Sequence, residues 1–123
     1  MELGSAVPDW LSDLFEAIDR MDSGGFVQFL ADYATFQFGN AQPVKGKENI
    51  RDAVAGFFSS IKGISHKLLG TWQVDDVVFL QGEVSYTRKD SRTVTIPFYN
   101  LFKMNGPLVS KYIIYIDVSP LYA

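Results

Sequence analysis

The sequence contains no cysteine and a single histidine, His66, and each scarcity excludes a kind of chemistry. Without cysteine the chain has no disulfide, no thiolate nucleophile and no cysteine-based zinc centre. Cysteine usage therefore does not indicate whether the protein works in an oxidising or a reducing compartment. One histidine leaves only scattered carboxylates as further metal ligands, and these show no recognisable ligand spacing. We therefore expect no metal and no other cofactor.

Positive charge and long apolar runs are also scarce. The chain has 11 Lys and Arg residues against 14 Asp and Glu residues, a formal net charge of −3, whereas nucleic acids and anionic lipids are bound by clustered Lys and Arg. No segment approaches the roughly 18 apolar residues of a membrane span, and the opening MELGSAVPDW lacks a basic region followed by an apolar run. We expect no nucleic-acid partner, no membrane partner and a cytoplasmic location.

Apolar side chains, by contrast, are plentiful. Of the 123 residues, 47% are hydrophobic and 15% are aromatic, which is the balance of a globular protein. A chain of this length buries about two thirds of its unfolded surface around one core. We therefore expect residues 1–123 to form a single domain.

The first half of the chain has helical periodicity interrupted by turn residues. Apolar residues recur from Trp10 to Met21 at the spacing of one helical stripe, Pro8 suits a first turn, and the run from Asp22 to Gly25 ends the pattern. The predicted elements, in order, are a helix at about 8–21, a short helix ending near Ala31, a strand through Ala34, Phe36 and Phe38, a loop over 39–47 and a helix at 48–61.

The second half alternates with period two from Ser65 to Val118. Turn residues interrupt the alternation at 74–76, 89–91 and 105–107, which predicts four consecutive strands in a meander. Helices followed by an antiparallel sheet define an α+β domain in which the helices cover one face of the sheet.

Hairpin register decides where Glu83 and His66 lie. Taken alone, the strand 77–88 places Glu83 opposite its apolar residues and therefore in solvent. If both hairpins turn through an even number of residues, Trp72 lies opposite Val77, Arg88 lies opposite Thr93, and His66 lies opposite Glu83. An odd-length loop or a β-bulge would reverse this assignment.

In that register both faces of the sheet are rich in apolar residues. One face is expected to form a lined cavity; it carries apolar Trp72, Phe79, Ile96, Phe98 and Phe102 with polar His66, Gln81, Glu83, Ser85 and Asn100. The other face is expected to be covered by a second copy of the chain in a homodimer; it carries Val78, Leu80, Val84, Tyr86, Tyr99 and Leu101.

The pair of Glu83 and His66 has two interpretations. Burial among apolar side chains raises the pKa of a carboxylate, and an imidazole within reach can exchange a proton with it or with a substrate. The pair then suits abstraction of a proton next to a carbonyl, with Asn100, Gln81 and Tyr112 donating hydrogen bonds to the enolate oxygen. The alternative is a hydrogen-bonded polar pair without catalytic role.

Three segments of the chain carry a family resemblance: LADYATFQFGN, PVKGKENIRDAV and the closing YIIYIDVSPLYA. Together with the long meander, they resemble the nuclear transport factor 2-like superfamily, in its SnoaL-like polyketide cyclase and ketosteroid isomerase-like branch. The resemblance implies a cystatin-like cone in which helices close one mouth of a curved antiparallel sheet around an apolar pocket. It also implies a dimer formed through the outer surface of the sheet.

Two mechanisms found in the superfamily do not carry over to this chain. The isomerase's base carboxylate falls at Phe38, and the epoxide hydrolase's Arg and two Asp residues fall at Glu83, Ser85 and Ile114. The resemblance favours Tyr112 over Tyr115 as the tyrosine that points into the pocket. The expected substrate-binding residues are Asn100, Tyr112, Ser85, Gln81, Phe36, Phe38, Phe98 and Trp72.

These observations predict a small-molecule-binding, SnoaL-like protein. Its expected activity is a cofactor-independent isomerisation, cyclisation or hydrolysis of a hydrophobic ring-bearing metabolite, with Glu83 as the acid or base and His66 as its proton partner. The alternative is a non-catalytic ligand-binding or protein-interaction domain of the same fold.

Overall fold

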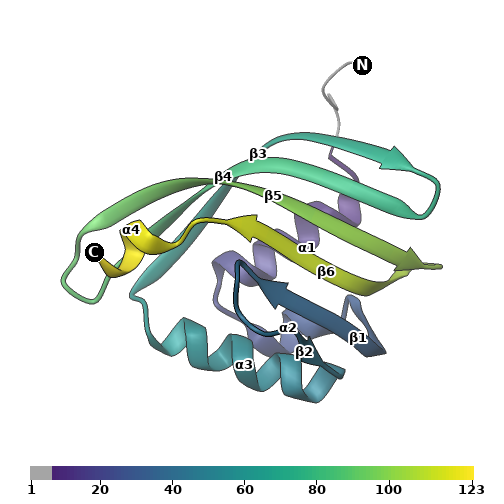
Figure 1. Cartoon of the computed structure of the whole chain (residues 1–123), viewed down its shortest axis with the longest axis horizontal. Helices are drawn as coiled ribbons and strands as arrows, with labels where there is room; N and C mark the ends of the chain where they lie inside the picture. Colours follow the sequence, from purple (N-terminus) through teal and green to yellow (C-terminus); the bar gives the residue numbers. More distant parts are fainter. Residues whose placement is uncertain (1–6) are drawn as a thin grey trace.

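The computed structural model describes residues 7–123 and consists of a curved six-stranded sheet with helices on one side (Figure 1). No helix in this described range is long and apolar enough to cross a membrane. The elements, in chain order, are α1 (Asp9–Asp19), α2 (Ser23–Val27), β1 (Leu30–Phe38), β2 (Val44–Lys45), α3 (Lys47–Ser59), β3 (Gly63–Val74), β4 (Val77–Thr87), β5 (Thr93–Asn105), β6 (Leu108–Ile116) and α4 (Ser119–Tyr122).

The predicted helices are present, and the second one is shorter than expected. Asp22 caps α2 by accepting a hydrogen bond from the Gly25 backbone N–H at 2.9 Å. The helix ends at Val27 because Leu30 already belongs to β1, where it pairs with Val109 of β6. Some of the apolar residues that predict a longer helix therefore belong to a buried strand. Periodicity alone does not distinguish a helix from a buried strand in so short an apolar run.

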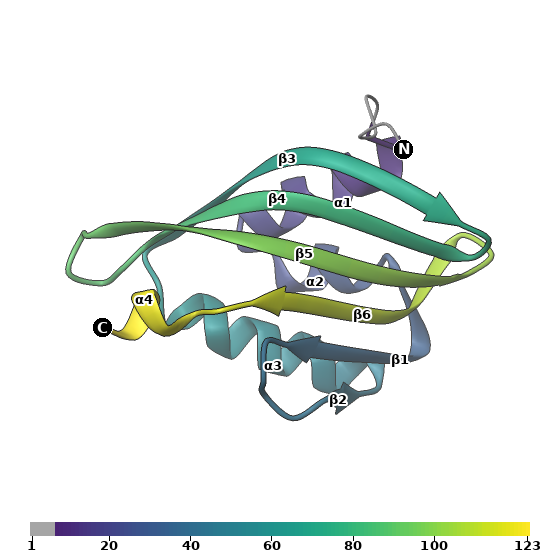
Figure 2. The same ribbon diagram turned by 45° about the horizontal axis from the view of Figure 1, so that its top comes forward.

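The sheet has the strand order β2-β1-β6-β5-β4-β3. The meander β3 to β6 is antiparallel as predicted, but β1 pairs in parallel with β6, so the sheet is mixed rather than wholly antiparallel. The predicted loop 39–47 also contains the short strand β2, which pairs with β1 at the far edge. Figure 2 shows α1, α2 and α3 on the same, concave side of the sheet.

The β3–β4 hairpin has the expected even turn but not the expected register. Val74 pairs with Val77 across the turn Asp75-Asp76, with Asp75 in the left-handed region (φ 55°). A β-bulge between Leu68 and Gly70 then shifts the pairing by one residue. His66 therefore lies opposite Val84, and the predicted pairing of His66 with Glu83 is wrong.

The β4–β5 hairpin also differs from the prediction. Thr87 pairs with Thr93, so the connection 88–92 has an odd number of residues and Arg88 has no strand partner. Glu83 consequently lies opposite Pro97 rather than Phe98. Because of the bulge in β3 and the odd β4–β5 connection, Glu83 lies on the face of the sheet opposite to His66, Phe98 and Asn100.

We call the helix-covered face the inner face and the opposite one the outer face. The inner face is buried and includes Val78, Leu80, Val84 and Tyr86 of β4 with Ile96, Phe98, Asn100 and Phe102 of β5. The outer face carries Phe79, Gln81, Glu83 and Ser85 of β4 with Thr95, Pro97, Tyr99 and Leu101 of β5.

Phe98 packs directly on the backbone of Gly82, its partner across the two strands. A Cβ atom added at Gly82 would lie 2.7 Å from Phe98 Cζ and 2.6 Å from the backbone oxygen of Lys67. Such distances are too short for any real Cβ atom, and one of the two neighbours is backbone. The absence of a side chain at this position is therefore what admits the Phe98 ring.

We predict that Gly82→Ala lowers the free energy of unfolding by about 1–3 kcal/mol, the usual cost of overpacking. Gly56→Ala is the matched control, because Gly56 lies in α3 with open space around it, and it should instead stabilise the protein by about 0.5–1 kcal/mol. Urea unfolding measures both changes. Equal stability of Gly82→Ala and wild type would contradict the packing described here.

Candidate functional site

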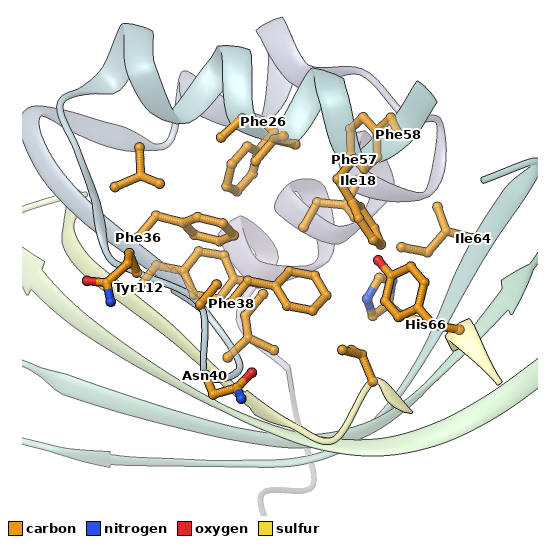
Figure 3. Close-up of a pocket in the computed structure, with 18 residues that line it drawn as sticks. Ile18, Phe26, Phe36, Phe38, Asn40, Phe57, Phe58, Ile64, His66 and Tyr112 are labelled. Atoms are coloured by element: carbon orange, nitrogen blue, oxygen red, sulfur yellow. The ribbon is translucent and has the colours of Figure 1, made fainter. Parts of the chain in front are cut away.

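A cavity of about 400 Å³ lies between the helices and the inner face of the sheet. Its wall is formed mainly by aromatic and aliphatic side chains from α2, α3, β1, β3 and β6 (Figure 3). The lining residues are Ile18, Phe26, Phe36, Phe38, Asn40, Ala41, Gln42, Val44, Ala53, Val54, Phe57, Phe58, Ile64, His66, Tyr112, Ile114, Val118 and Tyr122.

The aromatic side chains of the wall brace one another. Phe36 meets Tyr112 edge to face at a centroid distance of 5.3 Å, and Phe38 meets Phe57 at 5.1 Å. Pairs of this kind stabilise by about 0.5–1.5 kcal/mol beyond their buried area. The cavity therefore has a largely preformed shape suited to flat apolar ligands.

His66 brings a titratable ring into this apolar wall, and Asp19 holds it. The His66 ring Nδ1 lies 2.6 Å from Asp19 Oδ1, and the His66 backbone N–H donates to Asp19 Oδ2 at 3.2 Å. The side chains of His66 and Asp19 are 9% and 31% exposed. One carboxylate thus accepts two hydrogen bonds from one residue.

The fold explains why these two residues meet. β3 is an edge strand of the sheet in the part of the chain that the structure describes, so a backbone N–H pointing away from β4 faces no further strand there. Asp19 is the last residue of α1 and supplies an acceptor for the N–H of His66. The imidazole contacts the rings of Phe15 and Phe98, at centroid distances of 4.8 Å and 5.4 Å. Its orientation is therefore constrained by these two rings and by the contact of Nδ1 with Asp19.

Tyr112 and Asn100 form a second polar pair, on the inner face. Asn100 Nδ2 donates to the Tyr112 hydroxyl at 3.2 Å, and Asn100 is 2% exposed. None of the described residues gives Asn100 Oδ1 a hydrogen-bond partner. Burial raises the pKa of Tyr112 well above its ordinary value, the Tyr86 hydroxyl raises it further, and the hydrogen bond from Asn100 opposes them. Tyr112 therefore remains a neutral hydroxyl that can donate a hydrogen bond.

The structure places the ten predicted site residues in three groups. His66, Tyr112, Phe36 and Phe38 line the cavity, while Asn100 and Phe98 lie on the inner face just behind its wall. The predicted cavity positions of four residues are wrong, because the bulge in β3 and the odd β4–β5 connection place them on the outer face; they are Glu83, Gln81, Ser85 and Trp72. Ser85, for example, hydrogen-bonds Thr95 there at 2.8 Å.

Sequence reasoning missed Asp19, Asn40 and Gln42. Asp19 ends a helix, where a carboxylate is electrostatically unfavourable, and that oddity was the available signal of a tertiary partner. Asn40 and Gln42 are exposed residues of the β1–β2 loop and line the cavity with the exposed Tyr122 of α4. The exposed side chains of Asn40, Gln42 and Tyr122 mark the opening of the cavity to solvent.

No metal-binding group is present in the described part of the chain, since nowhere in residues 7–123 do three or more His, Asp or Glu side chains converge. The chemistry available at the cavity is that of an imidazole with a carboxylate behind it and a neutral phenol. Such groups can take up and return protons.

The curved sheet, the helices on its concave side and the enclosed apolar cavity define the class of cone-shaped α+β proteins. Within that class, the family model of the SnoaL-like domain matches residues 11–112, and the chain belongs to this family. No curated protein matches the sequence.

Solved structures share the fold at low sequence identity. A hypothetical protein with a ketosteroid isomerase-like fold from Catenulispora acidiphila, in complex with trimethylamine, has a TM-score of 0.87 at 14% identity, and the match covers 94% of this chain and 91% of that protein. TerC, co-crystallised with polyporic acid, has a TM-score of 0.81 at 13% identity and covers 91% and 92%. A candidate SnoaL-like polyketide cyclase from Jannaschia has a TM-score of 0.79 at 15% identity and covers 91% and 85%. These likenesses establish the fold.

Removing the Tyr112 hydroxyl should expose the cost of the buried Asn100. We predict that Tyr112→Phe destabilises the protein by about 1–3 kcal/mol, because Asn100 then has no partner for either of its polar atoms. The double variant Asn100→Leu, Tyr112→Phe should recover most of this loss. Urea unfolding measures both, with Tyr115→Phe on the exposed outer face as the neutral control. A single variant as stable as wild type would show that the pair contributes nothing.

Proposed function

We propose that this protein binds a hydrophobic ring-bearing metabolite and catalyses a cofactor-independent acid/base reaction on it: an isomerisation, cyclisation or hydrolysis. His66 is the base or acid, and the Tyr112 hydroxyl donates a hydrogen bond to a substrate oxygen. Asn100 positions that hydroxyl. The observation that carries the proposal is His66, paired with Asp19, in the wall of a mainly apolar and aromatic cavity.

An acid/base reaction of this kind develops positive charge at the base and negative charge at a substrate oxygen. When a neutral imidazole takes up a proton, the carboxylate hydrogen-bonded to its other nitrogen stabilises the cation. A neutral tyrosine can at the same time donate to the oxygen that becomes negative. In an apolar cavity both interactions are stronger than in water. Two proteins of similar fold were crystallised with small molecules, trimethylamine and polyporic acid, which supports small-molecule binding as the role of this chain.

Glu83 has no part in this proposal, because it lies on the outer face. The non-catalytic ligand-binding domain stays the second candidate, favoured by one observation: the described lining has one imidazole and no carboxylate or amine beside it. A binding domain needs no second acid/base group, whereas many acid/base enzymes use two. The cytoplasmic location stays a prediction from the sequence.

The test begins with a panel of cyclic ketones and phenols screened by ligand-induced shifts in melting temperature, followed by chromatographic assay of turnover. We predict that His66→Gln lowers turnover of a converted compound by at least about a hundredfold, the usual contribution of a general base. Glu83→Gln should leave it unchanged. Full turnover by His66→Gln would overturn the catalytic role, and stabilising ligands that are never converted by wild type would favour the second candidate.

We further propose a homodimer formed through the outer face. Tyr99 and Tyr115 pair directly across β5 and β6 there and are 52% and 56% exposed, and Phe79, on β4 opposite Leu101, is 38% exposed. Contiguous exposed aromatic surface of this kind is uncommon on a monomer. The residues of the proposed interface differ from those predicted from the sequence, since Val78, Leu80, Val84 and Tyr86 belong to the core.

Sedimentation velocity tests the dimer. We predict that wild type sediments at twice the monomer mass and that Tyr99→Lys with Tyr115→Lys gives monomers, because two buried ammonium groups would lack partners. Asp52→Lys, on the exposed side of α3, is the control and should leave the dimer intact. A monomeric wild type would contradict the proposal.

A further inference from the structure

The hydrogen bonds of Asp19 determine which nitrogen of His66 carries the proton. A carboxylate can only accept hydrogen bonds, and both oxygens of Asp19 accept from His66: Oδ2 from the backbone N–H at 3.2 Å and Oδ1 from the ring at Nδ1, 2.6 Å away. A neutral imidazole has one N–H. Because Nδ1 is the donor to Asp19, Nε2 carries the lone pair.

The ionic surroundings of the cavity favour an uncharged ligand. None of the described lining residues is Lys, Arg, Asp or Glu, and the charge held against His66 is the carboxylate of Asp19. An anionic ligand would lose its hydration, would meet no cationic side chain and would point its own acceptors at an acceptor nitrogen. An uncharged hydroxyl, by contrast, can donate to that nitrogen.

We infer that Asp19 is a positioning residue that holds His66 in the Nδ1–H form, so that the cavity selects an uncharged ring compound presenting a hydroxyl group to Nε2. This inference rests on the proposed function in taking the cavity as the ligand site, and it adds the chemical class of ligand. A phenol, enol or ring alcohol fits it, whereas the corresponding carboxylate or ether does not.

The protonation of His66 can be measured directly in the ligand-free protein. His66 is the single histidine of the sequence, so the two ring ¹⁵N resonances of labelled protein need no assignment against other residues. Long-range ¹H–¹⁵N correlation spectra near neutral pH should show a protonated Nδ1 and an unprotonated Nε2. A protonated Nε2, alone or together with Nδ1, would overturn the inference.

Three probes that share one ring test the selectivity by calorimetric titration: naphthalenemethanol, its methyl ether and naphthoate, all substituted at the same ring carbon. We predict that the alcohol binds about tenfold more tightly than the ether, which lacks the donor. It should bind at least about a hundredfold more tightly than naphthoate, whose charge would be buried without a partner. Equal affinities, or no binding by any of the three, would overturn the inference.

The variant Asp19→Asn should change His66 Nε2 from a hydrogen-bond acceptor to a donor with almost no change in the shape of the side chain. Its amide oxygen can accept from the His66 backbone N–H while its NH₂ donates to Nδ1, which moves the imidazole proton to Nε2. The alcohol's advantage over the ether should then disappear, and the affinity for naphthoate should rise about tenfold or more. An unchanged order of affinities in a variant whose His66 proton has moved would contradict the selectivity.

These outcomes separate the inference from the proposed function. The ¹⁵N spectra need neither ligand nor activity, so they remain decisive even if Asp19→Asn folds poorly. A protein that shows the predicted proton position and probe order but converts no substrate would retain the inference and lose the catalytic proposal.

Discussion

The pairing register of β3 and β4 is the constraint on which the rest of the structure depends. Side chains alternate between the two faces of a strand, so a shift of one residue exchanges every side chain between cavity and solvent. The bulge between Leu68 and Gly70 makes that shift in β3 and places His66 on the inner face. Gly82 admits the ring of Phe98 beside it, and Phe98 in turn supports the imidazole.

From this register follows a site built from three layers. The inner face of the sheet supplies Phe98 and the Asn100–Tyr112 pair, α1 supplies Asp19 at its last turn, and the aromatic residues of β1 and α3 close the cavity over them. Asp19 and Asn100, which lie behind the lining, hold His66 and Tyr112 in place. That arrangement gives an apolar cavity fixed directions of hydrogen bonding, which supports the proposal of acid/base chemistry on a ring compound.

Much of the fold could be predicted from the sequence, because it depends on periodicity. The first helix, the meander beyond Ser65 and the positions of its turns are local patterns, and the structure confirms them, although α1 ends at Asp19 rather than at 21. The family resemblance predicts Tyr112 in the cavity, and it lies there. The prediction of a helix for Leu30 is wrong, because a short apolar run fits a helix and a buried strand equally well.

The site itself was harder to predict, since it depends on two local irregularities. A bulge at Leu69 and an odd connection after Thr87 have no clear signature in their residues, yet they moved Glu83, Gln81, Ser85 and Trp72 to the outer face. Asp19 lies 47 residues from its partner His66, and no periodicity links a helix end to an edge strand. The parallel pairing of β1 with β6 is likewise a long-range choice that alternation alone does not specify.

The central claim is that ligands are recognised at His66 on the inner face and not at Glu83 on the outer face. Chemical-shift mapping of the ¹³C,¹⁵N-labelled protein during titration with a stabilising ligand tests it most directly. The account predicts that the largest shifts fall on the His66 ring and on the resonances of Tyr112, Phe38 and Phe57, while Glu83 and Ser85 stay unperturbed. Shifts centred on Glu83 and Ser85, with His66 unchanged, would contradict it.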